Sequence, residues 1–241
     1  MLYFAVMTAE YWMAVFFIAV AALLAAIFRK LNPAGAVAGW IVGSVVFLSG
    51  HYAGILMLGA FFVLGTTATS WKMHVKEQLK AAEKNKGRRN AAQVLANGGV
   101  AAIAGLLILL YPKEKILFLL MMAASLASAT ADTLSSELGT LYGKRFYNIL
   151  TLRNDRRGEN GVISLEGTLF GVAGSAVIAV IFSFAYEWTV YFFWIVLAGT
   201  IGNLCDSFLG ATLERKGYLG NNAVNFLNTL VAALAAWALM A

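Results

Sequence analysis

Residues 116–139 read ILFLLMMAASLASATADTLSSELG, and this stretch decides the fold class. The segment is long enough to cross the hydrocarbon core of a bilayer as a helix, which takes about 20 residues. Its second half nevertheless carries Asp132 and Glu137 among serines and threonines. A carboxylate at membrane depth is costly unless it is paired, hydrated or bound to a ligand. The stretch therefore predicts a membrane helix that ends in a polar site.

The rest of the chain is equally apolar. Hydrophobic residues make up 61% of its 241 residues and charged residues 12%, with a mean hydropathy of +0.76. These values exclude an ordinary soluble domain. Further apolar stretches lie near residues 11–28, 35–50, 53–71, 91–111, 162–185, 189–213 and 221–240. We therefore expect an all-α, polytopic transmembrane helix bundle of about seven to eight spans, forming a single integral membrane domain over residues 1–241.

The segment 35–50 is shorter than the others and contains Gly35, Gly39 and Gly43. It could be tilted, broken or re-entrant, so the sequence leaves open whether it crosses the bilayer fully.

Charge is distributed unequally between the two ends of the predicted spans. Sixteen of the 18 Lys and Arg residues fall in the loops at 29–30, 72–89, 144–157 and 215–216. The positive-inside rule then predicts a multi-pass protein of the cytoplasmic membrane, with these loops in the cytoplasm and both termini outside. Membrane topology and anionic lipid headgroups explain the net charge of +6. No nucleic-acid-binding motif is present, so we expect no nucleic-acid partner; the oligomeric state is left open.

Two parts of the chain share a pattern of small and polar residues. Gly65-Thr-Thr-Ala-Thr-Ser-Trp71 parallels Gly202-Asn-Leu-Cys-Asp-Ser-Phe208, and residues 90–102 align with residues 221–233 without a gap. This pattern predicts an internal duplication of a three-helix unit, with repeat units 31–111 and 162–241 joined by the linking span 116–139. Such repeats often place a binding site between their halves, although shared small-residue composition alone could produce part of the similarity.

Carboxylates and hydroxyls gather at the ends of spans on the basic-loop side. Asp132, Ser135 and Ser136 continue a polar helical face that also holds Ser125 and Ser128, and Glu137 lies on an adjoining face. Asp206 supplies a second intramembrane aspartate from another span. Because Mg²⁺ prefers oxygen ligands and keeps waters or substrate phosphates in its shell, these residues could form a magnesium or phosphate site. Hydrogen bonding between helices is the structural alternative.

Amide side chains lie at the same depth. One face of the last span carries Asn221, Asn225 and Asn228, and Thr229 follows directly after Asn228. In the alignment of the two units, Asn97 is the counterpart of Asn228. Amides cannot act as a general base, but they can bind a metal, a ribose, a base edge or phosphate oxygens. Polar contact between helices would equally explain them.

A basic loop leads into the span at 162–185. Lys144 and Arg153 precede the run Gly158-Glu-Asn-Gly-Val-Ile-Ser-Leu-Glu-Gly-Thr168. Ser164 is suited to cap the helix, and a helix start presents N–H groups and a positive dipole end to an anion. We therefore expect phosphate binding by this segment, including Glu166, Gly167 and Thr168; the positive-inside bias alone would account for the basic residues but not for the glycine-punctuated run.

Several of these motifs resemble those of the phytyl-phosphate kinase family, a group of polytopic membrane proteins long known as a domain of unknown function. The similarity rests on Asp132-Thr-Leu-Ser-Ser-Glu137, the 158–168 run, Gln93-Val-Leu-Ala-Asn97 and Asn225-Phe-Leu-Asn-Thr229. It covers nearly the whole chain after the first span. Plant members convert phytyl monophosphate to the diphosphate, and the family is more distantly similar to CTP-using dolichol and phytol kinases.

The resemblance implies a membrane kinase that transfers a phosphoryl group from a nucleoside triphosphate, preferably CTP, to an isoprenoid monophosphate such as phytyl or geranylgeranyl phosphate. Asp132, Glu137 and Asp206 are then the expected Mg²⁺ ligands. The residues expected to bind substrate or nucleotide are Ser135, Ser136, Lys144, Arg153, Ser164, Glu166, Gly167, Thr168, Asn97, Asn221, Asn225, Asn228 and Thr229. A membrane cytidylyltransferase acting on a lipid phosphate and a lipid or small-molecule transporter remain alternatives, although the apolar outer halves of the spans weigh against transport.

Overall fold

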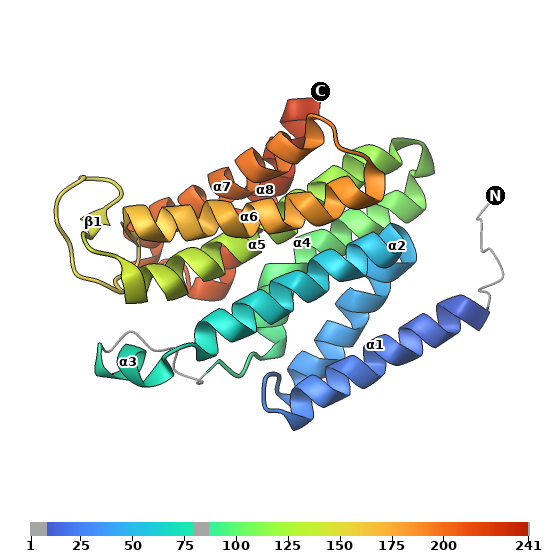
Figure 1. Cartoon of the computed structure of the whole chain (residues 1–241), viewed down its shortest axis with the longest axis horizontal. Helices are drawn as coiled ribbons and strands as arrows, with labels where there is room; N and C mark the ends of the chain where they lie inside the picture. Colours follow the sequence, from blue (N-terminus) through green and yellow to red (C-terminus); the bar gives the residue numbers. More distant parts are fainter. Residues whose placement is uncertain (1–8, 80–86, 241) are drawn as a thin grey trace.

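The computed structural model describes residues 9–79 and 87–240 and confirms an all-α polytopic bundle (Figure 1). Within these residues, seven helices are long and apolar enough to cross a membrane. They are α1 (Ala9–Ile27), α2 (Pro33–Ser70), α4 (Ala91–Leu110), α5 (Lys115–Tyr142), α6 (Leu165–Tyr186), α7 (Tyr191–Leu209) and α8 (Asn221–Met240). The shorter elements are α3 (Met73–Gln78), the 3₁₀ turn η1 (Pro112–Glu114), the π turn η2 (Gly210–Glu214), and the strands β1 (Tyr147–Asn148) and β2 (Val162–Ile163).

Helix α2 is a hairpin of two helical segments. Its 38 residues are interrupted at His51, where the backbone adopts φ 48° and ψ −144°. The chain then folds back on itself, so that a Cβ on Gly54 would lie 2.8 Å from the carbonyl oxygen of Val46. The two halves, 33–50 and 52–70, match the two spans predicted at 35–50 and 53–71. Seven long helices within the described residues therefore correspond to the eight predicted spans.

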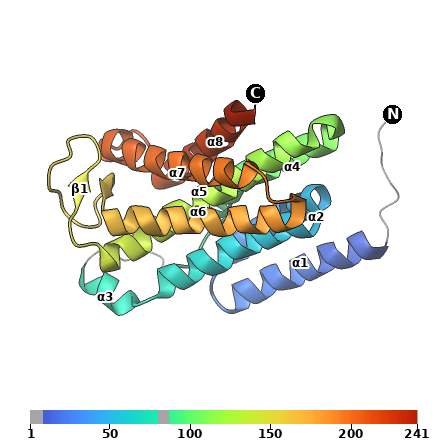
Figure 2. The same cartoon turned by 45° about the horizontal axis from the view of Figure 1, so that its top comes forward.

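Helix α5 is the centre of the bundle. Nearly every residue from Leu119 to Ala131 is fully buried, including both its apolar and its hydroxyl side chains. The helix packs against α2 and α4 on one side and against α6, α7 and α8 on the other. Helix α1 lies at the edge of the bundle and packs on α2 (Figures 1 and 2).

The two ends of the bundle differ in the segments that they carry. Helix α3 and the long α5–α6 connection, in which β1 pairs antiparallel with β2, lie at one end, which we call the loop end (Figure 2). The start of α1 and the end of α8 lie toward the opposite end, which we call the terminal end. The basic loops predicted from the sequence gather at the loop end, although Lys80, Lys84 and Lys86 lie outside the described residues. The orientation of these ends in a cell stays a prediction.

The two proposed repeat units share local features in the structure, apart from residues 80–86 and 241, which lie outside the described residues. Asn32 accepts a hydrogen bond from the Gly35 amide at 2.7 Å, and Ser164 accepts one from the Gly167 amide at 3.1 Å. In each unit this capped helix is followed by a helix that runs back and then by α4 or α8. These shared features support the duplication, which remains a proposal.

Candidate functional site at the loop end

Two aspartates from different helices meet within the bundle. Asp132 lies on α5 and Asp206 on α7, and their carboxyl groups are within hydrogen-bonding contact of each other. Both side chains are only half-buried, so the pair is not sealed inside the helix core. The structure therefore brings together two of the three carboxylates predicted to bind a metal.

A buried amide connects this pair to the helix core. The Nδ2 of Asn228 on α8 donates to Asp206 Oδ1 at 2.7 Å, and Ser128 Oγ donates to Asn228 Oδ1 at 3.0 Å. The side chains of Asn228 and Ser128 are fully buried. Because each polar group of this relay has a partner, the relay fixes the direction of the Asp206 carboxylate.

Glu214 is a member of the site that the sequence analysis missed. Its carboxylate is close enough to interact electrostatically with Asp132 and Asp206. Glu214 is the last residue of the π turn over Gly210–Glu214, which is closed by a bond from the Arg215 amide to the Gly210 carbonyl at 3.1 Å. A π turn takes an extra residue, so it rotates Glu214 back toward the face that carries Asp206. Regular helical spacing could not have revealed this.

The remaining asparagines connect α4 to α8. Asn225 Nδ2 donates to Asn97 Oδ1 at 3.4 Å, and Asn97 Nδ2 donates to the Gln93 carbonyl at 2.9 Å. Thr229 is fully buried and its hydroxyl faces the carbonyls of Phe226 and Ala96. These contacts fit the interhelical alternative, while Asn221 is exposed at the start of α8.

Glu137 faces a buried lysine. Lys76 of α3, only 1% exposed, donates from Nζ to Glu137 Oε2 at 2.5 Å and to the Ala68 carbonyl at 2.6 Å. A third bond reaches the Thr69 carbonyl at 3.2 Å. Lys76 thereby satisfies the last carbonyls of α2 and neutralises Glu137. Glu137 still adds to the negative potential at Asp132, but its carboxylate is directed toward a cation supplied by the protein.

The predicted helix start at Ser164 lies in a tight helix crossing. Ser164 and Gly167 are buried, and a Cβ on Gly139 of α5 would lie 2.8 Å from the Gly167 Cα. Ser164 caps α6 through the Gly167 amide, and Thr168 Oγ1 donates to the Ser164 carbonyl at 3.0 Å. The glycines of this run therefore permit α5 and α6 to touch, and Ser135 faces the same contact through its backbone.

The α5–α6 connection is fixed to the π turn. Asp155 Oδ2 pairs with Arg215 at 2.8 Å, and Arg215 Nε donates to the Asn160 carbonyl at 2.5 Å. Bonds from the Arg156 amide, the Asn148 side chain and Arg215 lower the pKa of Asp155. Gly161, with φ +74°, lies so close to Ala211 that a Cβ there would be 2.3 Å from the Ala211 Cβ. The connection thus covers the end of α7 just beyond the aspartate pair.

Other predicted site residues lie at the surface of the loop end. Lys144 and Arg153 are exposed, and Glu166 accepts a hydrogen bond from the Lys144 amide at 3.3 Å. Ser136 is also exposed and bonds to the Thr133 carbonyl of its own helix. It does not share the buried face of Ser128, because α5 presents polar residues to several neighbouring helices.

The donor set fits a two-carboxylate Mg²⁺ site. Among the described residues, no group of three or more His, Cys, Asp or Glu side chains is close enough to hold a metal ion alone. Mg²⁺ is commonly bound by one or two carboxylates together with substrate phosphates and waters. Asp132 and Asp206 meet that requirement, with Glu214 adding negative charge nearby.

Comparison with known proteins places the chain in a family. Residues 16–233 match the integral membrane protein family DUF92. The chain belongs to this family. The match confirms the family membership predicted from the sequence motifs and the multi-pass membrane character of this DUF92 protein.

Relatives of this DUF92 protein occur in plants, cyanobacteria and archaea. It is 34% identical to chloroplastic protein VTE6 of Arabidopsis thaliana over 86% of its own length and 64% of that relative. It is 34% identical to the uncharacterized membrane protein sll0875 of Synechocystis, over 87% of its length and 83% of the relative. It is 31% identical to the uncharacterized membrane protein MJ0933 of Methanocaldococcus jannaschii, over 92% of its own length and 91% of the relative. No solved structure matches the chain.

Proposed function

We propose that this DUF92 protein is a membrane kinase that transfers the γ-phosphoryl group of a nucleoside triphosphate to an isoprenoid monophosphate. The observation that carries the proposal is the meeting of Asp132 and Asp206 at the end of the bundle where the basic loops gather. The motif resemblance to the phytyl-phosphate kinase family supports a phytyl or geranylgeranyl acceptor. The preference for CTP as donor rests on that kinship alone.

The proposed reaction needs charge neutralisation more than acid–base chemistry. A phosphate oxygen of the isoprenoid monophosphate attacks the γ-phosphorus, and the bond from that phosphorus to the β–γ bridging oxygen breaks. The products are the isoprenoid diphosphate and a nucleoside diphosphate. Since the acceptor is already an anion, no strong base is required, and positioning with electrostatic stabilisation suffices.

The residues of the site would have different roles in this reaction. Asp132 and Asp206 would hold Mg²⁺, which when bound supplies positive charge at the nucleotide phosphates. Asn228 keeps the Asp206 carboxylate oriented through its 2.7 Å bond. Lys144 and Arg153, exposed at the same end, are suited to attract the polyphosphate from the cytoplasm.

Labelled nucleotides test the reaction class. Purified protein with Mg²⁺ is incubated with phytyl or geranylgeranyl monophosphate and with CTP or ATP labelled at either the α- or the γ-phosphate. A kinase transfers only the γ label to the lipid. Transfer of the α label with release of pyrophosphate would identify a cytidylyltransferase, and no transfer with any donor from folded protein would contradict the proposal.

Two variants assign the activity to the site. Asp132→Asn should lower the transfer rate by about 100-fold or more, because it removes a charged group from the phosphoryl-transfer site. Glu187→Gln makes the same chemical change at an exposed position at the terminal end and should leave the rate unchanged. Equal activity of both variants would show that Asp132 has no part in the reaction.

A further inference from the structure

An elongated cavity lies alongside the contact of α1 with α2. It has a volume of about 570 Å³ and lies between α1, the two halves of α2 and the start of α4. One face of α1 lines it, at residues 10, 13, 14, 17, 18, 21, 22 and 25. This face extends over about 22 Å, given the 1.5 Å rise per helical residue. The cavity therefore extends through most of the thickness of the hydrocarbon core, and its width is that of one face of α1.

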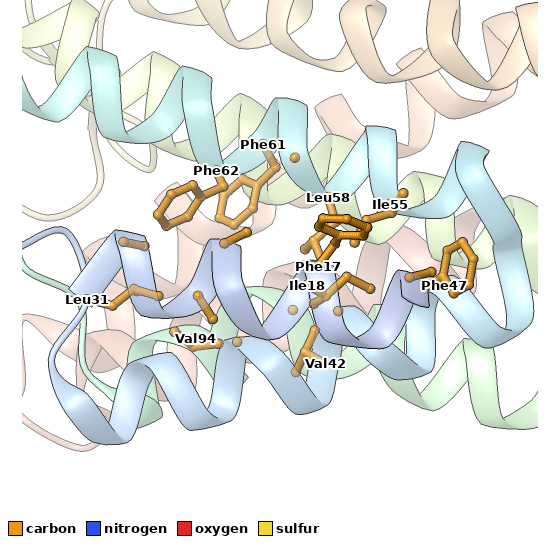
Figure 3. A pocket seen from close by; sticks show the side chains of 18 of the residues that line it. Phe17, Ile18, Leu31, Val42, Phe47, Ile55, Leu58, Phe61, Phe62 and Val94 are labelled. Carbon is orange, nitrogen blue, oxygen red and sulfur yellow. The ribbon is translucent and has the colours of Figure 1, made fainter. Parts of the chain in front are cut away.

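The walls of the cavity are apolar along its length. Figure 3 shows side chains of α1 facing those of both α2 halves, with the labelled residues Phe17, Ile18, Val42, Ile55, Leu58, Phe61 and Phe62. Leu31 and Val94 lie at one end of this view and Phe47 at the other. A wall of this composition suits a single hydrocarbon chain and offers few partners to a polar molecule.

The two ends of the cavity are polar and differ in charge. At the terminal end, Tyr52 donates to Glu10 at 2.8 Å. At the loop end the lining includes Arg89 and Gln93. Arg89 is only 8% exposed, and its guanidinium lies 5.0 Å from the centre of the Phe61 ring. An amphiphile with an anionic head would therefore enter with its head at the loop end.

The backbone holds Arg89 firmly in this position. Its amide donates to the Lys30 carbonyl, and its carbonyl accepts from the Asn32 amide, both at 2.9 Å. The guanidinium reaches Gly65, where a Cβ would lie 2.7 Å from Nη2. The same Cβ would lie 3.4 Å from the Thr133 methyl group. Thr133 is the neighbour of Asp132 on α5, so the cationic end of the cavity adjoins the helix that carries one aspartate of the pair.

We propose that this cavity binds the hydrocarbon tail of the isoprenoid monophosphate substrate, with Arg89 binding its phosphate. The inference rests on the proposed function and adds the location of the acceptor. A second cavity, between α2, α4 and α8, has a volume of about 520 Å³. Among the described residues, its lining includes Asn222 but no charged side chain, so it lacks a partner for a phosphate.

Binding without nucleotide tests the location independently of catalysis. A geranylgeranyl monophosphate analogue with a photoreactive group on its tail is bound to purified protein and activated by light. Cross-links should map to the α1 face and to residues 55–62, and unlabelled geranylgeranyl monophosphate should suppress them. Cross-links confined to the second cavity, or suppressed equally well by phosphatidylglycerol, would overturn the proposal.

Matched tryptophan variants test whether the cavity itself is required. Ala22→Trp fills the space, whereas Leu23→Trp places the same ring on a side chain that is 59% exposed on the opposite side of α1. Ala22→Trp should weaken binding of geranylgeranyl monophosphate by about tenfold or more, because the tail loses apolar contact. Leu23→Trp should bind like the wild type. Equal affinities of the two folded variants would contradict the proposal.

Substitutions of Arg89 test whether this residue binds the phosphate group of the ligand. Arg89→Gln should weaken the binding of geranylgeranyl monophosphate by about 10- to 100-fold. It should leave the affinity for geranylgeraniol, which lacks the phosphate, unchanged. Arg89→Lys should restore part of the loss. An equal loss for both ligands would show a merely structural role. Binding at this cavity without phosphoryl transfer would refute the proposed function but not the site; transfer unaffected by Ala22→Trp would refute the site but not the function.

Discussion

At the scale of single residues, the fully buried Asn228 is the side chain that joins the aspartate pair to the core. Asn228→Leu would remove its bonds to Asp206 and Ser128 and leave both without that partner. We expect a loss of stability of about 1–3 kcal/mol, as for other buried polar groups left unpaired, together with a loss of activity. Thermal unfolding in detergent and the transfer assay measure the two effects.

A neighbouring amide provides the comparison for Asn228. Asn225 is half-buried and makes a longer bond of 3.4 Å to Asn97. Asn225→Leu should therefore cost well under half as much stability as Asn228→Leu and retain activity. Equal effects of the two changes would show that Asn228 contributes only general helix packing.

Asp155 makes the docking of the α5–α6 connection depend on pH. Its pKa is lowered by bonds from the Arg156 amide, Asn148 and Arg215. A lowered pKa in the folded state stabilises the docked connection above the unfolded value of about 3.9, and this contribution is lost as pH falls through the folded pKa. Hydrogen exchange in residues 143–164 should thus increase relative to the rest of the protein only in acid. Asp155→Asn should exchange faster already at neutral pH and lose this dependence; an unchanged profile would exclude the mechanism.

At the scale of elements, a buried ion pair attaches α3 to the bundle. Lys76→Met would leave Glu137 buried without its cation and would remove the Nζ donor from the carbonyls of Ala68 and Thr69, of which Ala68 keeps the Trp71 amide at 3.2 Å. Breaking such a pair typically costs about 3–5 kcal/mol. We expect α3 to detach, which limited proteolysis within residues 72–79 would detect. Adding Glu137→Gln should restore much of the protection, and a double variant as sensitive as the single one would argue against the pair.

The turn that precedes β2 depends on close approach to the π turn. Gly161→Ala would place a Cβ within van der Waals overlap of Ala211 and would also strain a backbone at φ +74°. Gly217, at φ +73°, has open space around it, so Gly217→Ala measures the backbone cost alone, about 1 kcal/mol. Gly161→Ala should lower both stability and activity beyond that reference, whereas equal losses would show that docking against η2 is unimportant.

At the scale of the whole molecule, the arrangement of the two ends predicts the topology. Cys205 is the only cysteine of the chain, so a Cys205→Ser background allows single cysteines to be placed at Lys113 and Arg153. A membrane-impermeant maleimide applied to intact cells should label Lys113→Cys but not Arg153→Cys, and both should react after permeabilisation. The reverse pattern would place the aspartate pair on the outer side, away from cytoplasmic nucleotide.

Sequence periodicity predicted the helices well because the bilayer imposes a minimum length and apolarity on each span. It also anticipated that Asp132 and Asp206 share an end of the bundle. It did not find Glu214, whose direction depends on a π turn, or Arg89, whose proposed role depends on the cavity that α1, α2 and α4 enclose. It could not distinguish Glu137 from Asp132 either, because Lys76 approaches from a separate short helix. These features arise from tertiary contacts that helical spacing does not encode.

The proposed phosphoryl transfer requires the two aspartates to act together. The decisive measurement is the rate of γ-phosphate transfer from labelled CTP or ATP to geranylgeranyl monophosphate by the wild type, Asp132→Asn, Asp206→Asn and the double variant. Residues that act as a unit are not additive, so each single variant should lose about as much activity as the double, on the order of 100-fold. Full activity in either folded single variant would contradict a joint role of Asp132 and Asp206.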